Sequence, residues 1–87
     1  MNVYIIGSLT CCDKIYEMYN VYNKRYNTRY VYKLNNEMLE NAIKKCYDNI
    51  EWCDIVIAVS KDNKLYGDGV KYELEYARRL NKNIIYK

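Results

Sequence analysis

The stretch DIVIAV, residues 54–59, decides the fold of this chain. After Asp54 it is an uninterrupted run of apolar, mostly β-branched residues, and it ends at the polar segment SKDNKLYGDG, residues 60–69. An apolar run of this length without alternation is typical of a strand that is buried on both faces of a parallel sheet. The stretch therefore predicts a central parallel strand, with helices covering the sheet on both sides.

Strand-like and helix-like segments alternate along the rest of the chain. Short β-branched and aromatic segments predict further strands at residues 2–7, 28–34 and 83–87. Apolar residues spaced three and four apart predict helices between the strands, at residues 13–25, 35–52 and 67–82. The order βαβαβαβ implies right-handed crossovers between parallel strands. We therefore expect an α/β fold, a small three-layer Rossmann/flavodoxin-like domain with a four-stranded parallel sheet that spans residues 1–87.

The composition limits the classes of protein to which the chain can belong. Its 87 residues are 51% hydrophobic, which suits one small domain. Such a domain has little apolar surface to bury, so we expect a homo-oligomer, a dimer or higher. The net charge of +3 suits a phosphate-bearing small molecule and not a nucleic acid polymer, whose binding surface would be far more basic. The chain has no His, so acid-base chemistry must use other side chains.

The spacing of the four cysteines predicts neither a disulfide framework nor a metal site. No CxxC pair is present and no His completes a zinc set, so no metal site is expected. No signal peptide is apparent, and no apolar run approaches the roughly 20 residues of a membrane span. We therefore expect a cytoplasmic protein without membrane contact. Cys46 and Cys53 are expected to be buried, whereas Cys11 and Cys12 lie near a helix start, where a reactive thiol stays an alternative.

A ligand in such a fold is expected at the carboxyl ends of the strands, near the point where the strand order reverses. Three segments meet at this edge in the predicted fold: residues 7–12, residues 60–69 and the first turn of the helix that follows. Within the second segment, Ser60 and Asp62 are candidates to bond a sugar hydroxyl, and Tyr66 is a candidate to stack on a base.

Glu73 is a carboxylate at the edge of an apolar stripe. This stripe belongs to the last predicted helix and is expected to face the sheet. In GDGVKYELEYARRLNK, residues 67–82, the stripe consists of Val70, Leu74, Ala77 and Leu80. Glu73 is expected in the first turn, where the helix dipole stabilises an ionised carboxylate by about 0.3–1 kcal/mol. From the spacing alone, an ordinary first-turn acid that contacts no ligand is the simpler interpretation. Neither GxGxxG nor GxxxxGK[ST] is present, so no dinucleotide site, no P-loop and no cofactor are predicted.

Three motifs together resemble the nucleoside 2-deoxyribosyltransferase-like superfamily, which includes deoxynucleoside-monophosphate N-glycosidases. They are VYIIGSL at residues 3–9, CDIVIAV at residues 53–59, and GxGVxYELxYA at residues 67–77, which is followed by NKNIIYK. The resemblance implies that Glu73 is the nucleophile that attacks the anomeric carbon of a sugar, displaces the base and forms a covalent glycosyl intermediate. It also implies phosphate or sugar contacts at Gly7, Ser8, Gly67 and Gly69.

Two features of the chain differ from the family pattern. The family's second acid, which orients the sugar and moves protons, matches Cys46 in this chain. Asp48 is turned about 200° away from that position on a helix, so it cannot simply replace the acid. The first loop reads TCCDK, residues 10–14, where the monophosphate-cleaving branch is rich in glycine and arginine.

These features leave two hypotheses about function. The first is an enzyme that cleaves or transfers the N-glycosidic bond of a nucleoside or nucleotide through Glu73. The second is a catalytically impaired nucleotide-binding protein of the same fold, which sequesters a nucleotide-derived signal, for example as a phage protein that counters host defence. In both, the expected partner is a nucleoside or nucleotide small molecule. A structural or interaction module without a ligand is the third interpretation.

Overall fold

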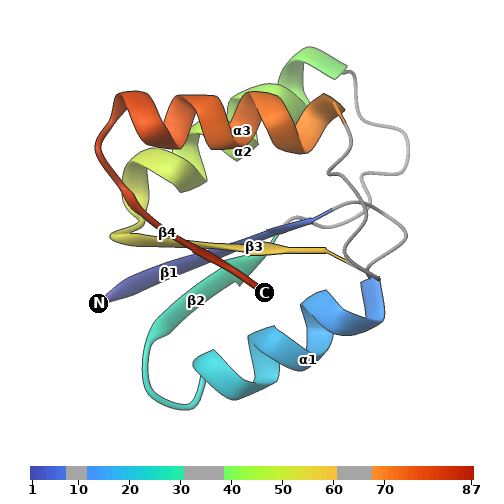
Figure 1. The fold of residues 1–87 in the computed structure, drawn as a ribbon, viewed down its shortest axis with the longest axis vertical. Coiled ribbons are helices and arrows are strands. Elements are labelled where there is room, and N and C mark those ends of the chain that lie inside the picture. Colours follow the sequence, from blue (N-terminus) through green and yellow to red (C-terminus); the bar gives the residue numbers. More distant parts are fainter. Residues whose placement is uncertain (8–11, 31–38, 61–67) are drawn as a thin grey trace.

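The computed structural model describes residues 1–7, 12–30, 39–60 and 68–87, and strands and helices alternate along the chain (Figure 1). In chain order the elements are β1 (Asn2–Gly7), α1 (Cys12–Tyr22), β2 (Asn27–Tyr30), α2 (Leu39–Trp52), β3 (Ile55–Val59), α3 (Asp68–Arg79) and β4 (Asn83–Tyr86). This is the predicted order βαβαβαβ.

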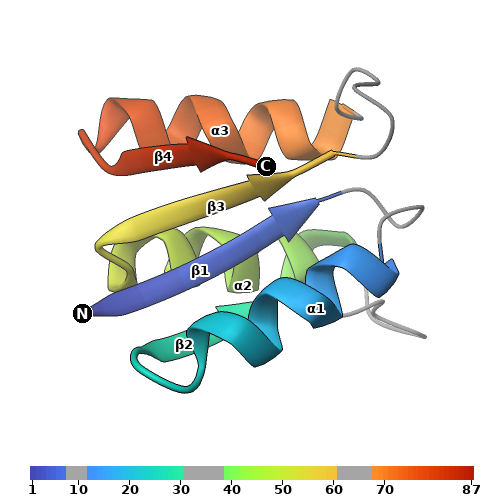
Figure 2. The ribbon, with the colours of Figure 1, turned by 60° about the horizontal axis from the view of Figure 1, so that its bottom comes forward.

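The strands form one parallel sheet in the order β2-β1-β3-β4 (Figure 2). The stretch that predicted the fold forms β3, which pairs with β1 so that Val3 lies beside Ile55 and Gly7 beside Val59. The predicted four-stranded, Rossmann-like α/β sheet is therefore confirmed. Because β2 lies on one side of β1 and β3 on the other, the direction of strand addition reverses at β1. The carboxyl ends of β1 and β3 form the edge where such folds bind ligands.

The boundaries of several elements differ from the predicted ones. β2 ends at Tyr30 and α2 begins at Leu39, and the predicted extensions of both fall at residues 31–38, outside the described part of the chain. α1 ends at Tyr22, earlier than predicted, because a turn follows it. The backbone N–H of Tyr26 donates to the carbonyl oxygen of Tyr22 at 3.0 Å and leads the chain into β2.

Helices cover both faces of the sheet, and each face has its own apolar core (Figure 1). Ile15 of α1 packs on the first face, against Val3, Ile5, Ile57 and Val59. Helices α2 and α3 pack on the second face, against Tyr4, Ile6, Val56 and Ala58. Successive residues of β1 and β3 are thus buried on opposite faces, which explains why both strands are continuous apolar runs.

α3 ends in a cap built around Asn81, whose φ of 57° lies in the left-handed region. The N–H of Asn81 donates to the carbonyl oxygen of Arg78 at 3.1 Å, and the N–H of Lys82 donates to that of Ala77 at 3.0 Å. These bonds satisfy carbonyl groups of the last turn, and Asn tolerates the left-handed region better than most residues. Leu80 therefore lies beyond the helix and is 39% exposed, so its predicted place in the apolar stripe was wrong.

Candidate active site

Glu73 lies in the second turn of α3, on the flank of the side that faces the sheet. The helix begins at Asp68, so Glu73 is its sixth residue, and the prediction of a first-turn acid was wrong. Val70, Leu74 and Ala77 are buried around it, as the predicted stripe requires. Glu73 itself is only partly exposed, so α3 holds a carboxyl group at the border of the apolar core.

Burial raises the pKa of the Glu73 carboxyl to about 7. The ionised form has lost part of its hydration, and this effect outweighs a hydrogen bond from Cys46, which acts in the opposite direction. The effect of the helix dipole falls off within the first turn, so it compensates little at the sixth residue. At this pKa, protonated and ionised Glu73 coexist near neutral pH, whereas the sequence pattern predicted an ionised carboxylate.

Cys46 of α2 contacts Glu73 across the interface between the two helices. Its side chain is half-buried instead of buried as predicted, whereas Cys53 of the same helix is fully buried. Burial, followed by the negative charge of Glu73, raises the pKa of the Cys46 thiol to about 11. The thiol therefore stays protonated at neutral pH and donates its hydrogen to the carboxylate. Cys46 lies beside Glu73, at the position where the family resemblance implies an acid.

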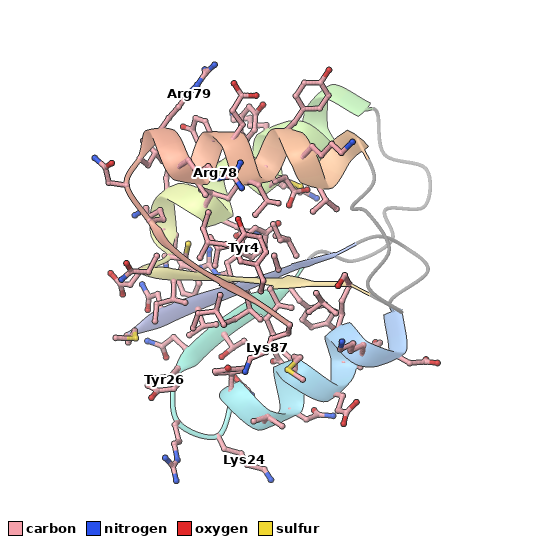
Figure 3. All side chains as sticks on the ribbon, viewed as in Figure 1. Tyr4, Lys24, Tyr26, Arg78, Arg79 and Lys87 are labelled. Carbon is pink, nitrogen blue, oxygen red and sulfur yellow. The ribbon has the colours of Figure 1, made fainter. Side chains whose placement is uncertain are left out.

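Tyr4 of β1 adds a hydroxyl group to this pair. Its side chain is fully buried between the sheet and the helices α2 and α3 (Figure 3). Burial, followed by the negative charge of Glu73, raises the pKa of Tyr4 far above its ordinary value, so the hydroxyl keeps its proton. The Cys46 sulfur and the Asn49 side chain lie close enough to influence that ionisation.

Two buried polar atoms of this cluster have no hydrogen bond of normal geometry. Among the described residues, neither Tyr4 Oη nor Glu73 Oε2 has a partner. Leaving a buried polar atom unsatisfied costs about 1–3 kcal/mol, so native proteins rarely keep two of them together without a reason. Together with the raised pKa of Glu73, this arrangement is typical of a functional site.

The helices that carry Glu73 and Cys46 are held against each other by their aromatic side chains. The rings of Tyr47 on α2 and Tyr76 on α3 stack with centroids 4.3 Å apart and an interplanar angle of 24°. The Tyr76 hydroxyl also donates a hydrogen bond to the Glu51 carboxylate at the surface. These contacts fix α3 relative to α2 and thereby the distance between the thiol and the carboxyl group.

Ser60 directly follows β3 at the carboxyl edge of the sheet, as predicted. Its hydroxyl and its backbone N–H both donate to the carbonyl oxygen of Lys87, at 3.3 Å and 3.0 Å. Its own carbonyl oxygen accepts a hydrogen bond from Lys14 Nζ of α1 at 2.9 Å. Lys14, which no sequence pattern singled out, places a positive charge at this edge.

Gly7 ends β1 at the same edge, and close packing explains why a glycine stands there. A Cβ atom at this position would lie 3.0 Å from Ile15 Cδ1 and 3.1 Å from the carbonyl oxygen of Val59. Both distances are shorter than ordinary van der Waals contacts. A side chain at position 7 would therefore crowd the Ile15 side chain and the Val59 backbone.

The remaining predicted site residues are distributed as follows. Gly69 lies in the first turn of α3. Four predicted ligand contacts lie outside the described residues, and these are Ser8, Asp62, Tyr66 and Gly67. The described residues thus bring together Glu73, Cys46 and Tyr4, and they place Gly7 and Ser60 at neighbouring strand ends.

Two features are absent from the described ranges, residues 1–7, 12–30, 39–60 and 68–87. No group of three or more His, Cys, Asp or Glu side chains in these ranges could hold a metal ion. None of the helices there is long and apolar enough to cross a membrane.

The chain has relatives among solved structures, although no protein-family model and no curated protein matches its sequence. A 2-deoxyribosyltransferase from Leishmania mexicana superimposes with a TM-score of 0.73 at 25% identity, over 98% of this chain and 62% of that one. A CMP N-glycosidase from Clostridium botulinum superimposes with a TM-score of 0.70 at 19% identity, over 99% of this chain and 70% of that one. The chain thus spans less than two thirds of the length of the deoxyribosyltransferase that it matches.

Proposed function

Because the chain has the fold of the nucleoside 2-deoxyribosyltransferase-like superfamily, we propose that it cleaves or transfers the N-glycosidic bond of a nucleoside or nucleotide, with Glu73 as the nucleophile. Both structural relatives are named for reactions at such a bond. The observation that carries the proposal is the partly buried Glu73 carboxyl, whose Oε2 is left without a hydrogen-bond partner among the described residues. Because Oε2 is buried, a substrate sugar could satisfy this oxygen only after the surrounding side chains move.

In the proposed reaction, an ionised Glu73 oxygen forms a bond to the anomeric carbon while the bond from that carbon to the base nitrogen breaks. The electron pair of the broken bond stays on the base, which then takes up a proton. Water releases the sugar from Glu73 in a hydrolase, and a second base does so in a transferase. The transition state is cation-like at the anomeric carbon, so the negative charge of Glu73 stabilises it.

The alternative is a catalytically impaired protein that binds a nucleotide-derived signal and sequesters it. Two observations favour this alternative. The pKa of Glu73 is about 7, so a part of the population lacks the ionised nucleophile at neutral pH. The neighbouring thiol has a pKa of about 11 and is therefore a poor proton donor to a leaving base, unlike the acid that the family places there. A phage protein that counters host signalling is the setting that we propose for this alternative.

One experiment separates the two functions. The protein is incubated with deoxynucleosides, their monophosphates, NAD-derived nucleotides and cyclic nucleotides. Free base is then measured, and the ligand that stays with the protein is recovered after denaturation. We expect base release from at least one compound and its loss in Glu73→Gln. Intact ligand recovered in stoichiometric amount from both proteins, without base release, would establish sequestration instead.

Glu75→Gln is the matched control for this substitution. Glu75 lies two residues further along the same helix, is exposed, and pairs with Arg79 at 3.0 Å on the surface. An exposed ion pair of this kind contributes about 0–1 kcal/mol, so the control should keep its fold and its base release. Mass spectrometry of quenched wild-type protein should also detect a glycosyl group on the peptide that contains Glu73.

We also propose that residues 1–87 act as one domain in the cytoplasm and assemble into a homo-oligomer. The oligomer is supported by the small size of the chain and by exposed apolar side chains such as Tyr72, Ile85 and Tyr86. Light scattering after size-exclusion chromatography tests it. A single species with the 10.5 kDa mass of one chain would contradict it.

A further inference from the structure

The side of α3 that faces α2 carries three residues in order from the core outward. Ala77 is fully buried in the core, whereas Tyr76 is only partly buried and packs its ring on α2. Each residue turns an α-helix by about 100°, so Glu73, one turn earlier, lies about 40° from Ala77 and about 60° from Tyr76, between the two. The buried Oε2 of Glu73 agrees with this place on the core side of Tyr76.

The orientation of α2 follows from its contacts with two neighbouring elements. Tyr47 stacks on Tyr76 of α3, whereas Asn49 Oδ1 accepts a hydrogen bond from Arg29 Nη1 of β2 at 3.2 Å. Ile50 is fully buried in the core that the two helices share with the sheet. α2 therefore turns its Tyr47 side toward α3, and the two stacked rings lie at the outer margin of that core.

The Tyr76 ring is held at two points. Its face lies on the Tyr47 ring, with centroids 4.3 Å apart, and its hydroxyl donates a hydrogen bond to Glu51 Oε1. Glu51 is held in turn, because Lys82 Nζ, from beyond the end of α3, donates to the Glu51 carbonyl oxygen at 3.2 Å. A ring that is fixed both at its face and at its hydroxyl group has little freedom to turn away from α2.

We propose that Tyr76 is a positioning residue that forms, with Tyr47, an aromatic cover on the solvent side of the Glu73 carboxyl group. The cover closes the interface between α2 and α3 on the side from which water would otherwise reach the carboxyl oxygens. Removal of a carboxyl group from water disfavours its ionised form. The aromatic cover thereby determines how much of Glu73 is ionised near neutral pH.

The titratable groups that face this interface in the described part of the chain come from three elements. α2 presents the Cys46 thiol, the Tyr47 hydroxyl and the Glu51 carboxylate, β1 presents the Tyr4 hydroxyl, and α3 adds the Tyr76 hydroxyl. The β3 side chains of this core are apolar. Loss of the Tyr76 hydroxyl would free the Glu51 carboxylate, and a nearby negative charge raises the pKa of a carboxyl group. This effect is opposite to the one expected from loss of the cover.

The test follows the titration of the Glu73 carboxyl carbon by NMR in the free protein, over about pH 4 to pH 9. The signal is assigned by its absence in Glu73→Gln. In Tyr76→Ala we expect the titration midpoint to fall from about 7 by roughly 0.5–1.5 pH units, because water reaches the ionised carboxylate. Tyr76→Phe keeps the stacked ring, so it should keep the midpoint near that of the wild-type protein. An unchanged midpoint in Tyr76→Ala would overturn the proposal.

Two further variants make the test selective. Tyr47→Ala removes the other ring of the cover, so it should lower the midpoint in the same direction, and it decides the question if Tyr76→Ala does not fold. Tyr72→Ala is the matched control, since it removes an exposed tyrosine from the position next to Glu73 on α3. It should leave the midpoint unchanged. An equal fall in Tyr72→Ala and Tyr76→Ala would assign the effect to a general loosening of the helix and contradict the cover.

The consequence for catalysis rests on the proposed function. A lower midpoint means more ionised Glu73 below pH 7, so the pH profile of base release in Tyr76→Ala should shift to lower pH by the same amount. Absent base release in all variants together with a selective midpoint shift would reject the reaction and keep the cover. Base release with the same midpoint in Tyr76→Ala and wild type would keep the reaction and reject the cover.

Discussion

The Cys46 thiol on α2 donates a hydrogen bond to the Glu73 carboxyl on α3, and this contact joins the two helices at the candidate site. The family resemblance implies a second acid as the neighbour of this carboxylate. In this chain the neighbour is a thiol that does not lose its proton at neutral pH. The chemistry of the site therefore depends on one carboxyl group that is itself only partly ionised.

The rate of base release should depend on pH through Glu73. Only the ionised carboxylate is a nucleophile, and its pKa is about 7. Below that value we expect kcat/KM to fall by about tenfold per pH unit, and above it to reach a plateau. Initial rates across this range give the profile. A rate that decreases as the pH rises through 7 would identify Glu73 as a proton donor instead.

The stability of the fold should also change with pH through Glu73. The pKa of Glu73 is raised in the folded state, from 4.5 to about 7, so the folded protein binds its proton more tightly than the unfolded chain. The resulting stabilisation is present below about pH 4.5 and is lost as the pH rises to about 7. The free energy of unfolding in urea should therefore shift in favour of Glu73→Gln as the pH rises. The difference between the variant and wild type should be roughly 1–3 kcal/mol more favourable to the variant at high pH than at low pH. Glu75→Gln should show no such pH-dependent gain.

Substitutions of Cys46 that remove the thiol hydrogen bond should raise the pKa of the Glu73 carboxyl group. The thiol hydrogen bond lowers the pKa of the carboxyl group, so its removal in Cys46→Ala should raise the NMR titration midpoint by roughly 0.5–1 pH unit. Cys46→Ser keeps a donor of similar size and should keep the midpoint. A serine variant that shifts as far as the alanine variant would show that the hydrogen bond is not the cause.

Removal of the Tyr4 hydroxyl should not destabilise the fold. Tyr4 Oη is buried and has no hydrogen-bond partner among the described residues, so Tyr4→Phe removes an unsatisfied group at little loss of volume. We expect its free energy of unfolding to equal or exceed that of wild type, by up to about 1 kcal/mol. A large loss of stability would contradict the unsatisfied state of this hydroxyl.

Gly7→Ala should destabilise the protein through crowding. The new methyl group would meet Ile15 Cδ1 at 3.0 Å and the Val59 carbonyl oxygen at 3.1 Å, and we expect a loss of roughly 1–3 kcal/mol in urea unfolding. Ile15→Val removes the first of these atoms but not the second. The double variant should therefore recover only a part of the loss, and a double-mutant cycle measures that part.

The sequence predicts the fold well because its strongest signals come from burial. The apolar stretch at residues 54–59 is continuous since β3 is covered on both faces, and the helical spacing of Val70, Leu74 and Ala77 follows from packing on the sheet. The end of α3 was less predictable. It depends on the backbone conformation of Asn81, and no hydrophobic pattern reports a positive φ.

The candidate site was only partly predictable. The position of Glu73 beside an apolar stripe was predictable. Its raised pKa was not, because desolvation depends on side chains that other elements bring to the same core. The strand pattern could have assigned Tyr4 to the same face as Ile6, yet it could not show that Cys46 and Glu73 influence the ionisation of the hydroxyl. The contact of Arg29 with Asn49 joins residues from β2 and α2, and no local signal in the sequence predicts it.

The bonds at the amino edge of the sheet also bear on how the chain is made. Asp54 Oδ2 accepts a hydrogen bond from the backbone N–H of Asn2, and the backbone N–H of Asp54 donates to the Asn2 carbonyl oxygen, each at 2.8 Å and across 52 positions of sequence. The central pair β1 and β3 is therefore the least local strand pair among the described residues, and pairings of this kind form slowly. On the ribosome, β1 must wait for β3 before either face of the sheet can close.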